Sequence, residues 1–219
     1  MILPDKNGDR RFVKTAIILA GGVSSRFGRD KGLLRLANKP LIKYVLDAVT
    51  SIVDERIVVV SSIAQSESYM EVTGPNVQVA IDKHDVRGPL VGALTGFEAA
   101  RGDYSLLLPC DTPLASREVL SLLLELCINK NAAIPRWPNG YIEPLQAAYC
   151  TNPALKAAEI AFEEKKFNMH CIVDKLRGVR YVSTLVIQQL DPVLRTFFNV
   201  NTPLDLRKAE GLLRHVNQL

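Results

Sequence analysis

LAGGVSSRFGRDK, residues 19–31, begins where the apolar run TAIIL of residues 15–19 ends. The β-branched apolar run is typical of a buried strand. Gly21 and Gly22 then allow a tight turn and a close approach to a ligand, because neither has a Cβ atom. A glycine-rich loop after a strand directs several backbone N–H groups to one point, which suits an anion. The sequence therefore predicts a phosphate-binding loop, although its glycine spacing matches neither the P-loop nor G-x-G-x-x-G.

Strand and helix patterns alternate along the first half of the chain. Short β-branched or leucine-rich runs predict buried strands, and apolar residues at helical spacing predict the helices between them. The predicted strands are 15–19, 56–61, 77–81 and 104–109, and the predicted helices are 40–52, 66–72 and 89–101. This alternation implies right-handed βαβ units, so we expect a doubly wound, three-layered α/β fold with a mostly parallel sheet.

Polar features follow three of the predicted strands. The glycine loop follows the first strand, Asp82 follows the third and Asp111 follows the fourth. In parallel sheets, ligands bind beyond the carboxyl ends of the strands. We therefore expect these three features to meet in one site at that edge.

The second half of the chain is less regular. The predicted helices are 116–127, 152–164, 168–176 and one capped by Thr202 that ends near residue 216; the predicted strands are 131–135, 142–150, 179–182 and 197–200. Asn152 and Asn168 are placed as N-caps of their helices. We expect one domain over 13–219, with a nucleotide-binding half of about 13–112 and an acceptor-facing half of about 113–219 that contains a small β-containing lobe. Residues 1–12 are expected to form a flexible extension.

The composition narrows the class of function. The formal charge of +4 suits anionic small molecules and is too low to indicate nucleic-acid binding. The four cysteines form no CxxC pair, which favours reduced thiols in a cytoplasmic protein over a disulfide framework or a zinc site. The polar N-terminus predicts no signal peptide, and no apolar run is long enough to predict a membrane span.

Five motifs together resemble a known superfamily. They are L-A-G-G-x-S-x-R-x-G-x-D-K at 19–31, GPLVG at 88–92, PCDTP at 109–113, EPLQAAY at 143–149 and NVNTP at 199–203. The set resembles the nucleotidyltransferases that join a nucleoside monophosphate to a phosphorylated acceptor, with a Rossmann-like fold. Within that superfamily it is most similar to the MobA-type molybdenum cofactor guanylyltransferases. The resemblance implies transfer of GMP from GTP to a molybdopterin-type pterin phosphate, which yields the guanine dinucleotide cofactor and pyrophosphate.

The resemblance and the residue chemistry together nominate catalytic residues. Lys31 would hold the α-phosphate or the leaving pyrophosphate, and Arg26 would assist at the β- and γ-phosphates, because phosphoryl-type transfer depends on charge neutralisation. Asp111 is the family's metal aspartate and would hold Mg²⁺ together with substrate phosphates. Arg26 could instead pair locally with Asp30, Lys31 could be a solvated lysine, and Asp111 could cap a turn. The predicted nucleotide-binding residues are Leu19, Ala20, Gly21, Gly22, Ser24, Arg26, Lys31, Ser61, Asp82, Gly88 and Asp111.

The base-reading residue is predicted to be Asp82. Guanine presents N1–H and N2–H₂ as adjacent donors, and one carboxylate accepts both. Asp85, three residues on, is a rival for this role, and a purely structural Asp82 is a third possibility. Ser61 stands where the family often carries an asparagine that contacts the nucleoside, and serine has a shorter reach.

The acceptor-binding residues are predicted from the second half of the chain. They are Asn199, Asn201, Lys165 and Lys166. Asn201 could instead form a turn while Thr202 caps a helix, and the lysines could belong to a solvated helix face. Glu143 is as readily explained by an architectural role, bonding backbone near the site.

Other functions remain open on the sequence alone. The same fold could carry a cytidylyltransferase acting on the same pterin, or a guanylyltransferase acting on another small phosphate such as phospholactate. A non-catalytic nucleotide or cofactor carrier would not need Lys31 and Asp111 together. The predicted partners are GTP, the pterin phosphate and other molybdenum cofactor biosynthesis proteins, without nucleic acid or membrane.

Overall fold

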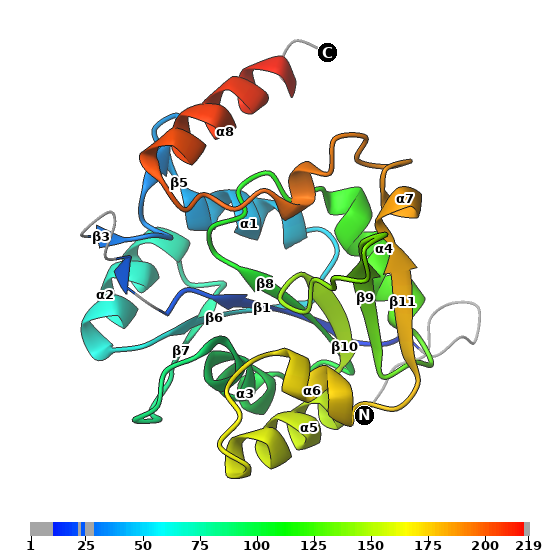
Figure 1. Ribbon diagram of the computed structural model, residues 1–219. Coiled ribbons are helices and arrows are strands. Elements are labelled where there is room, and N and C mark those ends of the chain that lie inside the picture. The colour runs from blue at the N-terminus through cyan, green and yellow to red at the C-terminus, as the bar shows by residue number, and fades with distance from the viewer. Residues whose placement is uncertain (1–10, 22, 25–28, 217–219) are drawn as a thin grey trace.

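The computed structural model describes residues 11–21, 23–24 and 29–216 and centres on one seven-stranded mixed sheet (Figure 1). Its strand order is β11-β9-β10-β8-β1-β6-β7. The strands are β1 (Lys14–Leu19), β6 (Glu55–Val60), β7 (Gln78–Ile81), β8 (Tyr104–Pro109), β9 (Ala132–Arg136), β10 (Ala147–Cys150) and β11 (Val179–Ser183). Only β10 runs antiparallel to its neighbours in this sheet. The predicted mostly parallel sheet is confirmed, and the second-half strands extend this sheet.

Helices cover both faces of the sheet, which gives the predicted three layers (Figure 1). On one face lie α1 (Leu41–Val49), α2 (Ile63–Thr73) and α4 (Arg117–Cys127); on the other lie α3 (Pro89–Ala99), α5 (Thr151–Glu163) and α6 (His170–Lys175). The chain ends with α7 (Thr184–Ile187), the 3₁₀ helix η1 (Arg195–Phe197) and α8 (Pro203–Val216). Two short antiparallel pairs, β2 (Val23–Ser24) with β3 (Arg29–Asp30) and β4 (Arg35–Leu36) with β5 (Lys39–Pro40), lie between β1 and α1.

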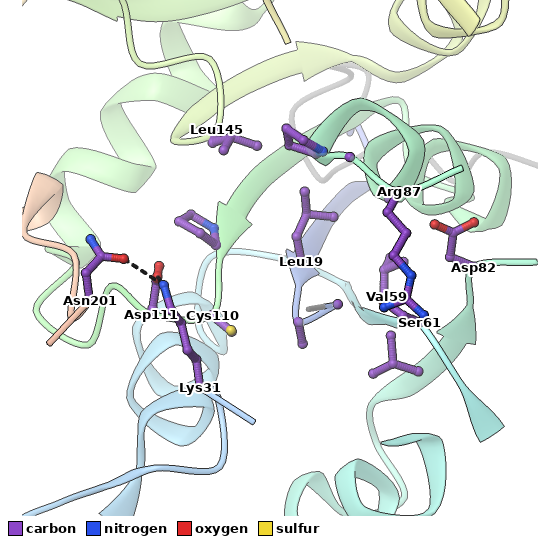
Figure 2. A pocket seen from close by; sticks show the side chains of 17 residues that line it. Leu19, Lys31, Val59, Ser61, Asp82, Arg87, Cys110, Asp111, Leu145 and Asn201 are labelled. Atoms are coloured by element: carbon purple, nitrogen blue, oxygen red, sulfur yellow. Dashed lines mark hydrogen bonds and ion pairs between the residues drawn. The ribbon is translucent and has the colours of Figure 1, made fainter. Parts of the chain in front are cut away.

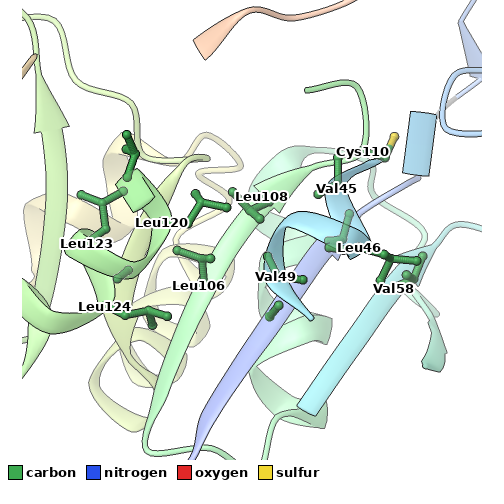
Figure 3. Close-up of a cluster of buried hydrophobic side chains, with 14 of the residues drawn as sticks. Val45, Leu46, Val49, Val58, Leu106, Leu108, Cys110, Leu120, Leu123 and Leu124 are labelled. Atoms are coloured by element: carbon green, nitrogen blue, oxygen red, sulfur yellow. The ribbon is translucent and has the colours of Figure 1, made fainter. Parts of the chain in front are cut away.

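The two-residue period of the strands divides the core between the faces. In β1, Ile17 faces the α3 and α5 side, whereas Ile18 faces the α1 and α4 side. Figure 3 shows the apolar cluster on the α1 and α4 side, in which Val45 of α1 and Leu120 of α4 lie on either side of Leu108 of β8. Side chains buried on both faces explain why these strands have near-continuous apolar sequences.

The α3 face is packed so closely that a side chain at one position would force its neighbours to shift. A Cβ atom on Gly96 of α3 would lie 2.3 Å from Cγ2 of Ile17. By contrast, a Cβ atom added to Gly211 of α8 would have no neighbouring heavy atom of the described residues within 4 Å. The backbone of α3 can therefore approach β1 only because residue 96 is glycine.

Glu55 joins the starts of β1 and β6 to the end of α3. Its carboxylate accepts hydrogen bonds from the Thr15 hydroxyl at 2.7 Å and from the backbone N–H of Arg101 at 2.9 Å. Burial alone would raise the pKa of Glu55, but these bonds and the Arg101 guanidinium outweigh it, so the pKa is lowered. The carboxylate is therefore held in its charged form in the folded protein.

The connections place a topological switch point beside β1. From β1 the chain runs through β6 to β7 at one edge, and α3 then returns over the opposite face to β8, which pairs with the other side of β1. Doubly wound sheets bind ligands in the crevice outside the carboxyl ends of the strands at such a point.

Some predicted elements differ from the structure. Residues 197–200 are not a strand: η1 ends at Phe197, and the N–H of Val200 bonds to the carbonyl of Asp111 in a loop. The strand predicted over 142–150 begins only at Ala147. The helix α5 begins at Thr151, so Asn152 lies inside its first turn and is not the N-cap.

Other predictions meet the structure in part. Asn168 does not hold the N-cap position of α6, but its side chain accepts a bond from the N–H of Cys171. The short α7 follows β11 directly and was not predicted. The predicted extension over residues 1–12 lies mostly outside the described residues. No helix among the described residues is long and apolar enough to cross a membrane.

Candidate active site

A pocket of about 610 Å³ opens at the switch point (Figure 2). It is built by the residues that follow β1, β6, β7 and β8, by the start of α3 and by the segment before α8. The lining includes nine residues predicted from the sequence: Leu19, Ala20, Gly21, Lys31, Ser61, Asp82, Gly88, Asp111 and Asn201. Within the described residues, the start of the glycine loop at Gly21, Asp82 and Asp111 therefore converge as predicted.

Lys31, Asp111 and Asn201 meet at one end of the pocket. The Lys31 ammonium donates to Oδ2 of Asp111 at 3.1 Å and to Oδ1 of Asn201 at 2.6 Å. The side chains of Lys31 and Asp111 are 25% and 14% exposed, so the ion pair is shielded but reachable. Since the three residues are far apart in sequence, the fold itself assembles this cluster.

The residues before and after Lys31 fix its backbone. Asp30 accepts hydrogen bonds from the Tyr69 hydroxyl and, at 2.6 Å, from the Gln65 side-chain amide. A Cβ atom on Gly32 would lie 2.2 Å from the Tyr69 hydroxyl oxygen. Tyr69 is fully buried, and burial raises the pKa of its hydroxyl, which keeps it a donor to Asp30. Lys31 is thereby held on a rigid segment beside α2.

Two contacts hold Asn201 opposite Lys31. The N–H of the buried Val200 donates to the Asp111 carbonyl at 2.8 Å, which ties this segment to the end of β8. Asp205 accepts bonds from the Thr202 hydroxyl at 2.8 Å and from the Asn201 N–H at 3.2 Å, and these bonds lower the pKa of Asp205 against the effect of burial. Thr202 thus joins the cap of α8, as predicted, and Asn201 faces the site at the same time.

Asp82 lies on the opposite side of the pocket from Lys31 (Figure 2). Its Oδ1 atom accepts from the backbone N–H of His84 at 3.0 Å, and the Nδ1 atom of His84 lies 2.9 Å away. The Thr95 hydroxyl is 3.4 Å from the same oxygen. Within the described chain, no residue bonds to Oδ2, which leaves that oxygen for a ligand. The rival Asp85 is exposed and does not line the pocket.

The other predicted residues fall into three groups. Gly22, Arg26 and the side chain of Ser24 lie outside the described residues. Asn199 is exposed and absent from the lining. The exposed Lys165 and Lys166 are also absent from it, and Lys166 pairs with Glu164 at 3.0 Å. An acceptor-binding role for these last three residues stays a prediction.

Glu143 makes contacts that fit the architectural role considered for it. It accepts from the indole N–H of Trp137 at 2.8 Å, and its own N–H donates to the Pro135 carbonyl at 3.0 Å. Burial raises the pKa of Glu143 more than the Trp137 bond lowers it. Its neighbour Leu145 is the residue of this motif that lines the pocket.

Sequence reasoning missed several lining residues. Arg87 is the only charged one, and it precedes the GPLVG motif directly. The apolar or small ones are Val59, Val60, Pro89, Gly92, Pro109, Cys110 and Leu145. Burial raises the pKa of the Cys110 thiol well above its usual range, so this cysteine lines the pocket as a neutral group. Most of these residues belong to the motifs or strand ends already noted, but the sequence does not show which of their side chains face the pocket.

A lysine–aspartate pair and a second carboxylate lie across a switch-point pocket that also includes Gly21, an arrangement typical of α/β enzymes that handle nucleotides. Comparisons with known proteins agree. The MobA-like NTP transferase domain family matches residues 16–177. A probable molybdenum cofactor guanylyltransferase of Methanosarcina mazei is 33% identical over 207 residues, with 92% of each chain covered. The molybdenum cofactor guanylyltransferase of Desulfosudis oleivorans is 32% identical, with 91% of this chain and 96% of the relative covered.

A solved structure shares the fold. It is the molybdopterin-guanine dinucleotide biosynthesis protein A of Archaeoglobus fulgidus, with a TM-score of 0.78, 26% identity, and coverage of 92% of this chain and 99% of that one. The chain belongs to the MobA-like NTP transferase family, and it is therefore a nucleotidyltransferase.

Proposed function

We propose that this protein transfers GMP from GTP to a molybdopterin-type pterin phosphate and releases pyrophosphate. The observation that carries the proposal is the pocket with two chemically different ends: Lys31, Asp111 and Asn201 at one side, and the available oxygen of Asp82 at the other. Relatives named molybdenum cofactor guanylyltransferase, about a third identical over most of the chain, support the choice of nucleotide and acceptor.

The reaction requires little covalent help from the protein. An oxygen of the acceptor phosphate attacks the α-phosphorus of GTP, the bond to the bridging oxygen breaks, and pyrophosphate leaves with that electron pair. The attacking phosphate is already anionic, so no residue has to remove a proton from it. The Lys31 ammonium, on its rigid segment, stabilises the charge that grows on the phosphates.

The residues at the reaction end are compatible with Mg²⁺. Among the described residues, no group of three His, Cys, Asp or Glu side chains could hold a metal by itself. Mg²⁺ is normally held by one or two carboxylates together with substrate phosphates. The shielded Asp111 carboxylate and the Asn201 amide oxygen supply such a partial site. A bound Mg²⁺ would neutralise charge on the phosphates.

Base choice separates this proposal from the cytidylyltransferase alternative. The Asp82 carboxylate is mostly shielded from solvent, and its Oδ2 atom needs a donor when a base covers it. Guanine offers N1–H and N2–H₂ to that oxygen.

The four free cysteines suit a reducing compartment, so we place the reaction in the cytoplasm.

The test is a transfer assay with each nucleoside triphosphate and purified pterin acceptor, with dinucleotide and pyrophosphate both measured. We expect GTP to be used and CTP to be rejected. In Asp82→Asn the amide presents a donor where the carboxylate accepted, so use of GTP should fall about tenfold or more, while use of CTP changes little. Transfer of CMP by the wild-type protein would reject the guanylyl assignment. An Asp85→Asn variant is the matched control and should keep the preference.

A further inference from the structure

Arg87 is the one charged lining residue without an assigned role. It is exposed, and it makes no hydrogen bond or ion pair with any other described residue. The nearby Asp82 bonds to His84 and Thr95 and not to Arg87. A guanidinium group that lines a ligand pocket with all its donors available is suited to an acceptor-rich ligand.

The loop that carries Arg87 is braced from the second half of the chain. The ring of His84 packs against Phe162 of α5 with centroids 4.7 Å apart. At the other end, a Cβ atom on Gly88 would lie 3.0 Å from the carbonyl oxygen of Phe167, which is closer than most Cβ contacts, so the start of α3 packs tightly against this segment. The segment from 82 to 88 is therefore anchored at both ends, and Arg87 is presented by a fixed loop.

Arg87 lies at the Asp82 side of the pocket. In Figure 2 its side chain extends toward Val59 and Ser61, whereas Lys31 and Asp111 lie across the pocket. The phosphates have their own cation at the far side in Lys31. This placement favours contact of Arg87 with the base over contact with the reacting phosphates.

Asp82 alone reads only part of guanine. Its Oδ1 atom is occupied by His84, so a single carboxylate oxygen faces the N1–H and N2–H₂ donors. The remaining features of guanine are the O6 and N7 acceptors, and arginine binds these two atoms in a bidentate manner. A carboxylate and a guanidinium on one loop together complement the guanine outline. Adenine carries an amino donor where guanine has O6, and cytosine has no N7.

We propose that Arg87 is a specificity-determining residue that donates to O6 and N7 of the guanine base. This inference rests on the proposed function, because it assumes that the bound base is guanine. It assigns recognition of the donor edge to Asp82 and recognition of the acceptor edge to Arg87.

The test measures nucleotide binding by calorimetry with Mg²⁺ present, so it needs no acceptor. Arg87→Ala should weaken GTP binding by about 10- to 100-fold, as expected for a lost bidentate pair. In the wild-type protein, 7-deaza-GTP should bind about five- to tenfold more weakly than GTP, because it lacks N7. In Arg87→Ala the two nucleotides should bind equally. The preference for GTP over ITP, which lacks the N2 amino group, reports on Asp82 and should persist.

Lys83→Ala is the matched control, because Lys83 is an exposed cation of the same loop outside the lining. It should leave the preference for GTP over 7-deaza-GTP unchanged. Equal losses for GTP, 7-deaza-GTP and CTP in Arg87→Ala would overturn the proposal and indicate a general electrostatic role. Unchanged GTP binding in Arg87→Ala would overturn the proposal, and a raised KM for the acceptor in the transfer assay of the same variant would then assign Arg87 to acceptor binding. A wild-type protein without guanine preference would instead reject the proposed function, whatever Arg87 does.

Discussion

The contact between Asn201 and Lys31 makes a quantitative prediction about how the two residues depend on each other. Lys31→Ala removes a cation that we place on the transferring phosphates. Loss of one such contact costs about 2.7–4 kcal/mol, so kcat should fall about 10²- to 10³-fold. Asn201→Ala removes the acceptor that holds the ammonium at 2.6 Å. Loss of one positioning hydrogen bond of about 1.4 kcal/mol should lower kcat about tenfold.

The double variant distinguishes two roles for Asn201. If the amide acts by orienting the ammonium, it has nothing to orient once Lys31 is alanine. The kcat of the double variant should then be at most about threefold below that of Lys31→Ala. Compared with the tenfold effect of Asn201→Ala alone, this corresponds to a coupling energy of about 0.7–1.4 kcal/mol between the two residues. If Asn201 instead acts independently of Lys31, on Mg²⁺ or on the acceptor, the two losses should multiply to about 10³- to 10⁴-fold.

The assay is steady-state kinetics at saturating GTP and acceptor, with urea unfolding of every variant to confirm an intact fold. Lys83→Ala serves as the control for loss of a cation outside the lining. An effect of Lys31→Ala on KM alone would refute the transition-state role, since it would show that the lysine contributes equally to ground-state binding. A multiplicative double variant would refute the positioning role of Asn201.

Three further predictions follow from contacts already described. Asp111→Ala should leave less than a tenth of the Mg²⁺-dependent turnover while the unfolding midpoint in urea stays close to wild type, because it removes a ligand and no core volume. Gly96→Ala should cost about 1–3 kcal/mol of unfolding free energy in urea by overpacking against β1, whereas Gly211→Ala in open space should be neutral or stabilising by up to about 1 kcal/mol. The pKa of Glu55 is lowered from its ordinary value of 4.5, so the stabilisation by its carboxylate is present above that pH and is lost as the pH falls through the folded pKa. The difference in unfolding free energy between wild type and Glu55→Gln should therefore be about 1–3 kcal/mol at pH 7 and should shrink below about pH 4.5. A gap that stays constant down to pH 3 would contradict the last prediction.

The position of Asp82 and Asp111 could be predicted because it depends on local pattern and one general rule. Each follows an apolar strand, and parallel strands bring their carboxyl ends to a common edge. Asn201 is different: it reaches the site from 170 residues after Lys31 through a loop without periodic signal. Only the resemblance of its motif indicated it.

The strand wrongly predicted over 197–200 and the omission of Arg87 from the predicted site have a common physical cause. Residues 197–200 are apolar enough to read as a strand, but the N–H of Val200 finds its acceptor in the loop at Asp111 and not in a neighbouring strand. Arg87 reads as an ordinary exposed loop residue. Its direction is set by packing of its loop against Phe162 and Phe167, about 80 residues later. Local sequence does not encode such tertiary partners.

We propose that the structure separates the choice of base from the chemistry of transfer. The loop from Asp82 to Gly88 is braced by α5 and the segment after it, whereas Lys31, Asp111 and Asn201 are held by α2, β8 and the cap of α8. In the part of the chain that the structure describes, the hydrogen bonds of one group share no partner with those of the other. Sites without shared partners contribute almost additively. Changes in the loop from Asp82 to Gly88 should therefore alter affinity and base preference at nearly constant kcat.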